Sequence, residues 1–78
     1  MIKEGVFLEF NYNKLKGKIK EVYGTQQEFA KALGISATTL NTRLKNETFF
    51  NQSEIEKTRD LLNLQTEQDI IDIFFTTA

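Results

Sequence analysis

The sequence predicts a mainly α fold, a bundle of about five short helices. Apolar residues recur at helical spacing, as at Leu15, Ile19 and Val22. Short patterns that start helices occur at several places, and glycines follow two of the apolar stretches. With 78 residues and a mass of 9.0 kDa, the chain is expected to form one small domain with a modest core.

The first helix is expected at residues 13–23, where the apolar stripe precedes Gly24, a natural helix stop. Its lysines form two pairs at i, i+4, so they cannot all share one face. They are Lys14 with Lys18 and Lys16 with Lys20. Gly17 costs about 1 kcal/mol relative to Ala inside a helix, and close packing is the preferred explanation for it, ahead of close approach of a DNA backbone.

A second helix is expected directly afterwards, because Thr25 and Glu28 have the spacing of a capping box, with a hydrogen bond in each direction. The residues it should bury are Phe29, Ala30 and Leu33. Gly34 can take the left-handed conformation that ends this helix, and Ser36 can cap the next one. The connection is therefore predicted to be short and sharply bent.

The third helix is predicted to bury Leu40 and Leu44, which are four residues apart. Its outer face would then carry small polar residues: Ala37, Thr38, Asn41, Thr42 and Lys45. The polar stretch that follows contains Phe49 and Phe50, of which at least one ring should pack on the core.

Two further helices are expected in the C-terminal half. A capping box from Ser53 to Glu56 is predicted to open the fourth, which buries Ile55 and Leu62 and stops near Asn63. A third cap, from Thr66 to Asp69, opens the last segment. Its apolar residues exceed one helical stripe: Ile70, Ile71, Ile73, Phe74 and Phe75.

Residues 1–12 are interpreted as an N-terminal arm or a short strand, separate from the main domain at residues 13–78. Val6, Leu8, Phe10 and Tyr12 alternate with other residues, which is the two-residue period of a strand. Such a strand could pair with residues 71–75 of the same or a second subunit. An ordered coil that packs its aromatic rings is an equal alternative.

The composition argues against an enzyme and against a cofactor. Without cysteine or histidine, the chain cannot form an ordinary zinc site or a Ser-His or Cys-His catalytic pair, so no metal is expected. Acidic residues interrupt the N-terminal apolar run, and no stretch approaches a membrane span of about 20 residues. A cytoplasmic protein with no membrane association and no small-molecule substrate is therefore expected.

Charge is divided along the chain, although the formal net charge is only -1. Residues 13–45 hold seven cations and two acids, a net charge of +5, whereas residues 51–78 hold two cations and six acids, a net charge of -4. A basic half of this kind could face phosphate while the acidic half faces away. Chance unevenness in a helical protein is the alternative.

The segment from Thr25 to Leu44 resembles the Cro and phage-repressor type of helix-turn-helix protein. The residues that carry the resemblance are Thr25-Gln26, Phe29-Ala30, Leu33-Gly34-Ile35-Ser36 and Leu40. The residues around Tyr12–Ile19, Thr39-Leu40, Arg43-Leu44 and Ile73–Thr76 further resemble small Cro-like regulators of phages and prophages of Gram-positive bacteria. The chain departs from such repressors at Arg43, where they commonly bury an apolar residue, so the roll of the third helix stays open.

The resemblance implies that the third helix enters a DNA major groove. Base contacts are then expected from Ala37, Thr38, Asn41 and Thr42, and phosphate contacts from Gln26, Gln27, Ser36, Arg43 and Lys45. The opposing interpretation is that these polar residues only keep a short helix soluble.

The resemblance also implies a transcriptional regulator, by default a repressor, that binds a palindromic double-stranded operator as a homodimer. Phe74 and Phe75 are the candidate dimerisation residues, because adjacent rings point in different directions, so one can enter the core while the other is left for a partner. Coverage of both rings within the monomer by the N-terminal segment is the alternative. The rival function is a protein–protein interaction module, such as an antirepressor, that uses the acidic, aromatic C-terminal half.

Overall fold

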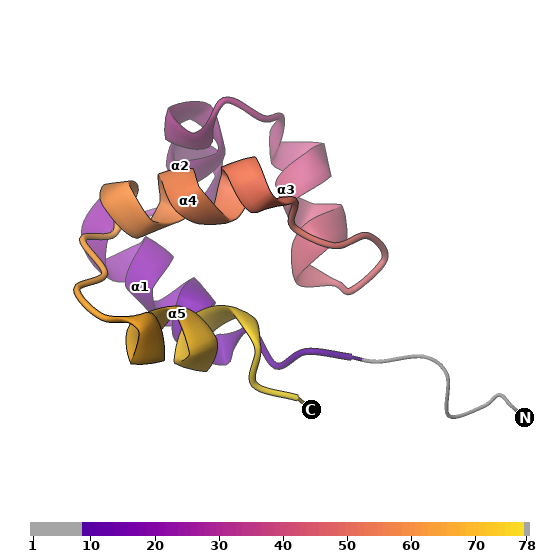
Figure 1. Cartoon of the computed structure of the whole chain (residues 1–78). Helices are drawn as coiled ribbons and strands as arrows, with labels where there is room; N and C mark the ends of the chain where they lie inside the picture. The colour runs from indigo at the N-terminus through magenta and orange to yellow at the C-terminus, as the bar shows by residue number, and fades with distance from the viewer. Residues whose placement is uncertain (1–8, 78) are drawn as a thin grey trace, which may run out of the picture.

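The computed structural model describes residues 9–77, which form a bundle of five helices (Figure 1). In order they are α1 (Asn13–Tyr23), α2 (Gln26–Leu33), α3 (Ala37–Leu44), α4 (Gln52–Leu61) and α5 (Glu67–Phe74). The predicted mainly α fold is confirmed. Val6 and Leu8, part of the predicted strand period, lie outside the described residues. No helix in the described part combines the length and the apolar character needed to cross a membrane.

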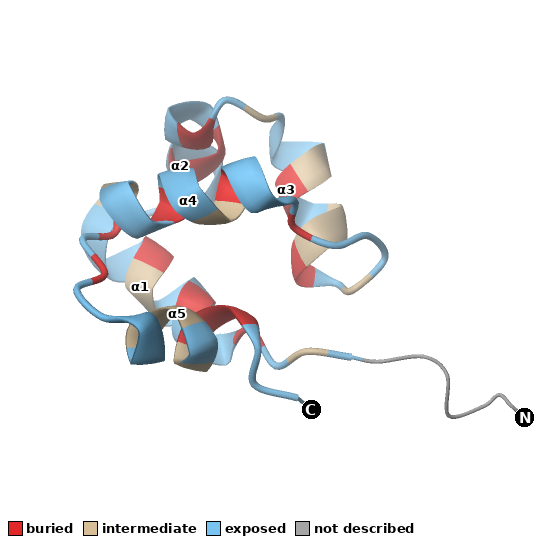
Figure 2. Cartoon of the chain, viewed as in Figure 1, coloured by how far each residue is buried: buried red, intermediate tan, exposed pale blue. Residues whose placement is uncertain are grey.

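Helix α2, at the top of the view in Figure 1, packs against α1, α3 and α4, while α1 also packs against α5. Buried residues lie mainly on the sides of the helices that face one another, and exposed residues on the outer sides (Figure 2). The core consists of Tyr12, Leu15, Ile19, Phe29, Ala30, Leu33, Leu40, Leu44, Phe50, Leu62, Leu64, Ile73 and Phe74.

The inward stripe of α1 differs from the predicted one at its end. Leu15 and Ile19 are fully buried, but the predicted core residue Val22 is 49% exposed. The stripe continues instead to Tyr23, which is half-buried and packs on Phe29 with ring centroids 5.5 Å apart. Spacing of i, i+4 and i+8 therefore defines this face, and Val22 lies at its edge.

The helix starts are set by side-chain caps. Thr25 Oγ1 accepts from the Glu28 N–H at 3.1 Å as predicted, but among the hydrogen bonds of residues 9–77 Glu28 makes no return bond. Thr66 and Asp69 form the predicted reciprocal box that opens α5.

The predicted start of α4 at Ser53 is wrong by two residues. Asn51 is the cap: its Oδ1 accepts from the Glu54 N–H at 2.8 Å, and Glu54 Oε1 accepts from the Asn51 N–H at 3.1 Å. Asparagine is as good an N-cap as serine, and Glu54 stands at the third helical position, where it can complete the box.

The connection between α2 and α3 is the predicted sharp turn. Gly34 has φ 85°, and both its N–H and that of Ile35 donate to the Ala30 carbonyl. Ser36 Oγ then accepts from the Thr39 N–H at 3.0 Å and begins α3. Burial of Leu40 and Leu44 fixes the roll of α3.

The two ends of the described chain run side by side (Figure 1). Phe10 and Thr77 form one isolated antiparallel bridge, and the Asn11 N–H donates to the Thr76 carbonyl at 2.6 Å. The predicted strand pairing with residues 71–75 is wrong, because most of that segment is helical and places Phe74 in the core. Residues 9–12 are therefore the ordered coil of the alternative interpretation.

Candidate functional site

The outer face of α3 presents three of the four predicted base-contacting residues. Ala37, Thr38 and Asn41 are exposed, and Lys45 is exposed at the end of the helix. The Ser36 hydroxyl is already engaged, since it accepts from the Thr39 N–H and donates to Thr39 Oγ1 at 2.9 Å. Its predicted phosphate contact would compete with the cap of α3.

Thr42 is half-buried, and its hydroxyl also has partners within the protein. Thr42 Oγ1 donates to the Thr39 carbonyl at 2.8 Å and lies 3.2 Å from Thr48 Oγ1. The side chain therefore has less freedom to bond a base edge than Thr38 has. Of the four predicted base-contacting residues, Ala37, Thr38 and Asn41 are therefore the ones left exposed.

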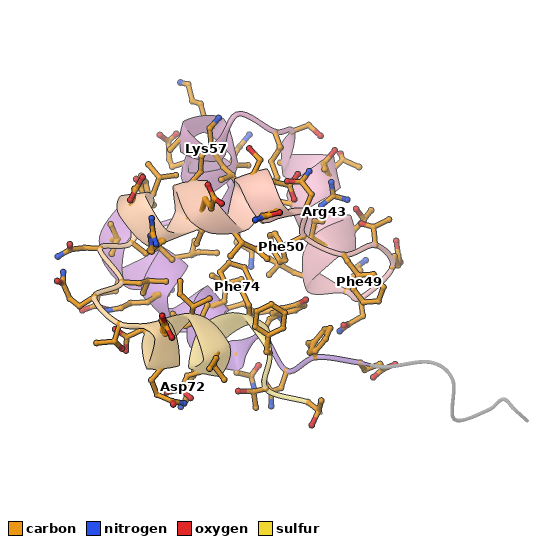
Figure 3. All side chains as sticks on the ribbon, in the orientation of Figure 1. Arg43, Phe49, Phe50, Lys57, Asp72 and Phe74 are labelled. Carbon is orange, nitrogen blue, oxygen red and sulfur yellow. The ribbon has the colours of Figure 1, made fainter. Side chains whose placement is uncertain are left out.

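Arg43 lies at the junction of α3 and α4, where Glu54 binds its guanidinium (Figure 3). Nε and Nη2 donate to the two carboxylate oxygens of Glu54 at 2.9 and 3.0 Å, and Nη1 donates to Thr48 Oγ1 at 2.7 Å. The two charged side chains are only 17% and 9% exposed. Arg43 thus joins two helices, a role the sequence analysis missed.

The hydrogen bonds within this pair favour the charged form of both groups. The bond from Arg43 lowers the pKa of the Glu54 carboxyl, although burial acts in the opposite direction. The same bond raises the pKa of Arg43. Two features of the sequence could have indicated this ion pair. Arg43 occupies a position expected to be apolar, and Glu54 stands where it can cap the next helix.

The first turn of α2 lies beside two lysines of α1. Gln26 and Gln27 are exposed there. A shallow hollow of about 260 Å³ is lined by Gln26, Thr25, Lys16 and Lys20, among others. Lys14 and Lys18 line a different hollow together with Asp69 and Asp72. The structure therefore separates the lysines of α1 into two groups, of which one accompanies the predicted phosphate-binding glutamine.

A second surface is an open hollow of about 320 Å³ built almost entirely from aromatic rings. We call it the aromatic hollow; it is lined by Phe10, Tyr12, Phe49, Phe50, Ile55, Phe74 and Phe75. Phe49 is 57% exposed and Phe75 is 48% exposed, so two rings on its rim are available to a partner. Figure 3 shows Phe49 at the edge of the bundle, with Phe50 and Phe74 deeper inside.

The rings of the hollow contact one another edge to face or tilted. Phe10 is the hub, with ring centroids 6.1 Å from Phe49 and 5.9 Å from Phe75. Phe50 and Phe74, 5.1 Å apart, form the floor. Phe74 is only 2% exposed within the monomer. Of the two predicted dimerisation residues, Phe75 alone offers its ring to a second molecule.

Exposed acidic residues occur in the segments that line the aromatic hollow. Glu9 precedes Phe10, Glu47 lies in the loop that carries Phe49, and Glu56 follows Ile55. The three acids are neighbours of the lining residues in the sequence and do not themselves line the hollow.

Residues 8–77 match the family described as Protein of unknown function (DUF739). The chain belongs to this family. Among solved structures, the chain is similar to the solution structure of the modulator of repression (MOR) of the temperate bacteriophage TP901-1 from Lactococcus lactis, with a TM-score of 0.73 and 39% sequence identity. The match covers 86% of this chain and 89% of the MOR chain.

None of the curated proteins matches this DUF739 chain. The likeness is thus to a small phage regulatory protein of nearly the same length. The resemblance of the sequence to small regulators of phages and prophages agrees with this match to a phage protein.

Proposed function

We propose that this DUF739 protein modulates repression in a phage or prophage by binding a repressor protein through the aromatic hollow. The observation that carries the proposal is the pair of exposed rings, Phe49 and Phe75, that flank the hollow with Phe10 between them. Exposed apolar patches on small soluble domains mark interaction sites. Full burial of one such side chain contributes about 1.5–3 kcal/mol.

Charge supports a repressor as the partner. A repressor must carry a basic DNA-binding surface, and the exposed acids Glu9, Glu47 and Glu56, in the segments that carry lining residues of the hollow, would complement such a surface. The similar phage protein is named a modulator of repression, which describes action upon repression. This is the interaction-module function that the acidic, aromatic half of the sequence suggests.

The test is a titration of the protein with the repressor encoded in the same phage or prophage, followed by calorimetry. Phe49→Ala and Phe75→Ala should each weaken binding by about tenfold or more, as expected for an aromatic anchor. Val22→Ala and Ile71→Ala are matched controls, because each removes an apolar side chain that is 49% exposed outside the hollow. Equal affinities for all four variants would refute the proposal.

Direct DNA binding through α3 is the second candidate. It is supported by the exposed residues Ala37, Thr38 and Asn41, and by the net charge of +5 over residues 13–45. In this function Lys45, Gln26 and Gln27 contact phosphates. Arg43 is left out because Glu54 and Thr48 already bind its guanidinium.

A reading helix of this length usually requires a second copy, with half-sites about 34 Å apart. Phe75 is then the candidate contact between the two copies, as an exposed ring of the hollow.

A gel-shift assay on DNA flanking the gene tests this second function across salt concentrations. Affinity should fall steeply as salt rises, and Thr38→Ala and Asn41→Ala should weaken specific binding more than non-specific binding. Lys45→Ala should weaken both. Absence of any shift at low salt, together with repressor binding, would leave the interaction module as the function.

A further inference from the structure

Asn46 connects the end of α3 to the aromatic hollow through its side chain. The Phe10 N–H donates to Asn46 Oδ1 at 2.8 Å, and Asn46 Nδ2 donates to the Phe10 carbonyl at 3.0 Å. One amide thus satisfies both backbone groups of a residue 36 positions away, as a neighbouring β-strand would. Both bonds are partly buried.

The backbone of Asn46 does not by itself require this side chain. Asn46 has φ 65° just after α3, and its N–H donates to the Arg43 carbonyl at 3.1 Å. Glycine is the usual residue for a left-handed position that ends a helix, and asparagine is a substitute. Asn63 takes the same conformation after α4 with φ 55°, but its Oδ1 accepts only from nearby Gln65.

The residue held by Asn46 is the hub of the hollow. The ring of Phe10 contacts those of Phe49 and Phe75, the two exposed rings. On the other side of the arm, the Asn11 N–H donates to the Thr76 carbonyl. Phe10 and Asn11 are therefore held between the end of α3 and the segment after α5, and Asn46 supplies the link to α3.

We propose that Asn46 is a positioning residue that fixes Phe10 in the aromatic hollow and couples occupancy of the hollow to the last turn of α3. The inference rests on the proposed function in taking the hollow as the binding site, but its test requires no repressor. A ligand that displaces the backbone of Phe10 together with its ring would stretch the two hydrogen bonds to the amide of Asn46, whose own N–H bonds to the last turn of α3.

The first measurement compares Asn46→Gly with Asn63→Gly in the full chain by NMR. Glycine readily adopts the left-handed backbone conformation in both variants, so the substitution removes the side-chain amide without straining the backbone. In Asn46→Gly, the Phe10 amide should exchange with solvent about threefold to tenfold faster, as expected for a lost hydrogen bond. The proton contacts from the Phe10 ring to Phe49 and Phe75 should weaken as well.

Asn63→Gly should leave Phe10 unchanged, which separates positioning from a general loss of stability. Asn46→Asp keeps an acceptor for the Phe10 N–H and loses the donor to the Phe10 carbonyl. The Phe10 amide of this variant should therefore exchange at a rate between those of the wild type and Asn46→Gly. Unchanged Phe10 exchange and ring contacts in Asn46→Gly would overturn the inference.

The second measurement uses indole as an aromatic probe of the hollow. In the wild type, indole should shift the amide signals of Arg43, Leu44 and Lys45 as well as those of Phe49 and Phe75. In Asn46→Gly, the shifts in the hollow should persist while those in α3 become at least about twofold smaller, in keeping with the size of local coupling. Equal shifts of α3 in the two proteins would overturn the coupling.

The repressor titration gives an independent result. If the repressor fails to bind but Asn46→Gly still releases Phe10 and uncouples α3, the proposed function is wrong and the role of Asn46 stands. If the repressor binds through Phe49 and Phe75 and Asn46→Gly changes neither Phe10 nor α3, the proposed function stands and the role of Asn46 is wrong.

Discussion

The ion pair of Arg43 and Glu54 joins α3 to α4 through two hydrogen bonds. Its two-pronged geometry satisfies both carboxylate oxygens, and Glu54 also caps its own helix by accepting from the Asn51 N–H. Removing one partner would leave a poorly solvated charge next to the junction of the two helices. The pair therefore fixes where α3 ends relative to α4.

Stability should depend on pH through Glu54. Its pKa in the folded protein is lowered, so the unfolded chain binds more protons in the range between that pKa and the unfolded value of about 4.3. The stabilisation is fully present above the unfolded value and is lost as pH falls through the folded pKa. Urea unfolding of the wild type at several pH values below about 5 should show this loss.

Glu54→Gln should cost about 1–3 kcal/mol at pH 7 and should flatten the acid limb of the stability curve. Glu56→Gln is the control, because Glu56 is an exposed acid on the same helix. The role assigned to the pair would be contradicted if both variants retained the acid sensitivity of the wild type.

Gly17 is a second residue whose substitution is informative. Beyond the neighbouring backbone of its own helix, a Cβ at this position meets no atom of residues 9–77 within 4 Å, so the expectation that Gly17 permits close packing is wrong. Gly17→Ala should therefore raise the free energy of unfolding by about 1 kcal/mol through helix propensity, detected as a higher melting temperature. Gly34→Ala is the contrasting variant: with φ 85° it should destabilise by about 1–2 kcal/mol.

At the level of helices, the elements formed by local signals were predictable from sequence. Capping at Thr66 and the glycine turn at Gly34 depend on residues within one turn of each other, and both predictions are confirmed. Two local predictions failed because two patterns competed. Asn51 and Ser53 could each cap α4, and Val22 and Tyr23 could each continue the stripe of α1.

The contacts that shape the candidate sites were not predictable in this way. Arg43 pairs with a residue 11 positions away, and Asn46 bonds a residue 36 positions away. Contacts between residues so far apart in the sequence leave no periodic pattern in it, because they depend on how the helices pack. The aromatic hollow was missed for the same reason: its rings come from Phe10, the start of α1, the loop before α4 and the end of α5.

The choice of cap for α4 can be checked directly. Asn51→Ala should lower stability by about 1 kcal/mol, because the Glu54 N–H loses its acceptor. Ser53→Ala should change stability by only a few tenths of a kcal/mol, since serine and alanine differ little in an exposed helical position. Chemical denaturation of the two variants measures the difference. A larger loss of stability in Ser53→Ala than in Asn51→Ala would indicate that Ser53 is the cap.

Across the whole molecule, the two candidate surfaces have opposite chemistry. The face of α3 and the first turn of α2 belong to the half with a net charge of +5, whereas the aromatic hollow has acidic residues in its lining segments. Asn46 and Arg43 lie where α3 meets the elements around the hollow. A partner bound in the hollow would thus contact the molecule next to the end of its exposed helix.

Substitutions of two adjacent residues, Phe74 and Phe75, should distinguish an effect on folding from an effect on partner binding. Phe74 is 2% exposed and packs on Phe50, so Phe74→Ala should lower the free energy of unfolding by about 3–5 kcal/mol. Phe75 is 48% exposed, and Phe75→Ala should cost only about 1 kcal/mol while it weakens repressor binding. Urea unfolding and calorimetric titration of both variants measure the two effects. If Phe75→Ala lowers the free energy of unfolding as much as Phe74→Ala does, the Phe75 ring mainly stabilises the fold, and the main argument for the hollow as a docking site is refuted.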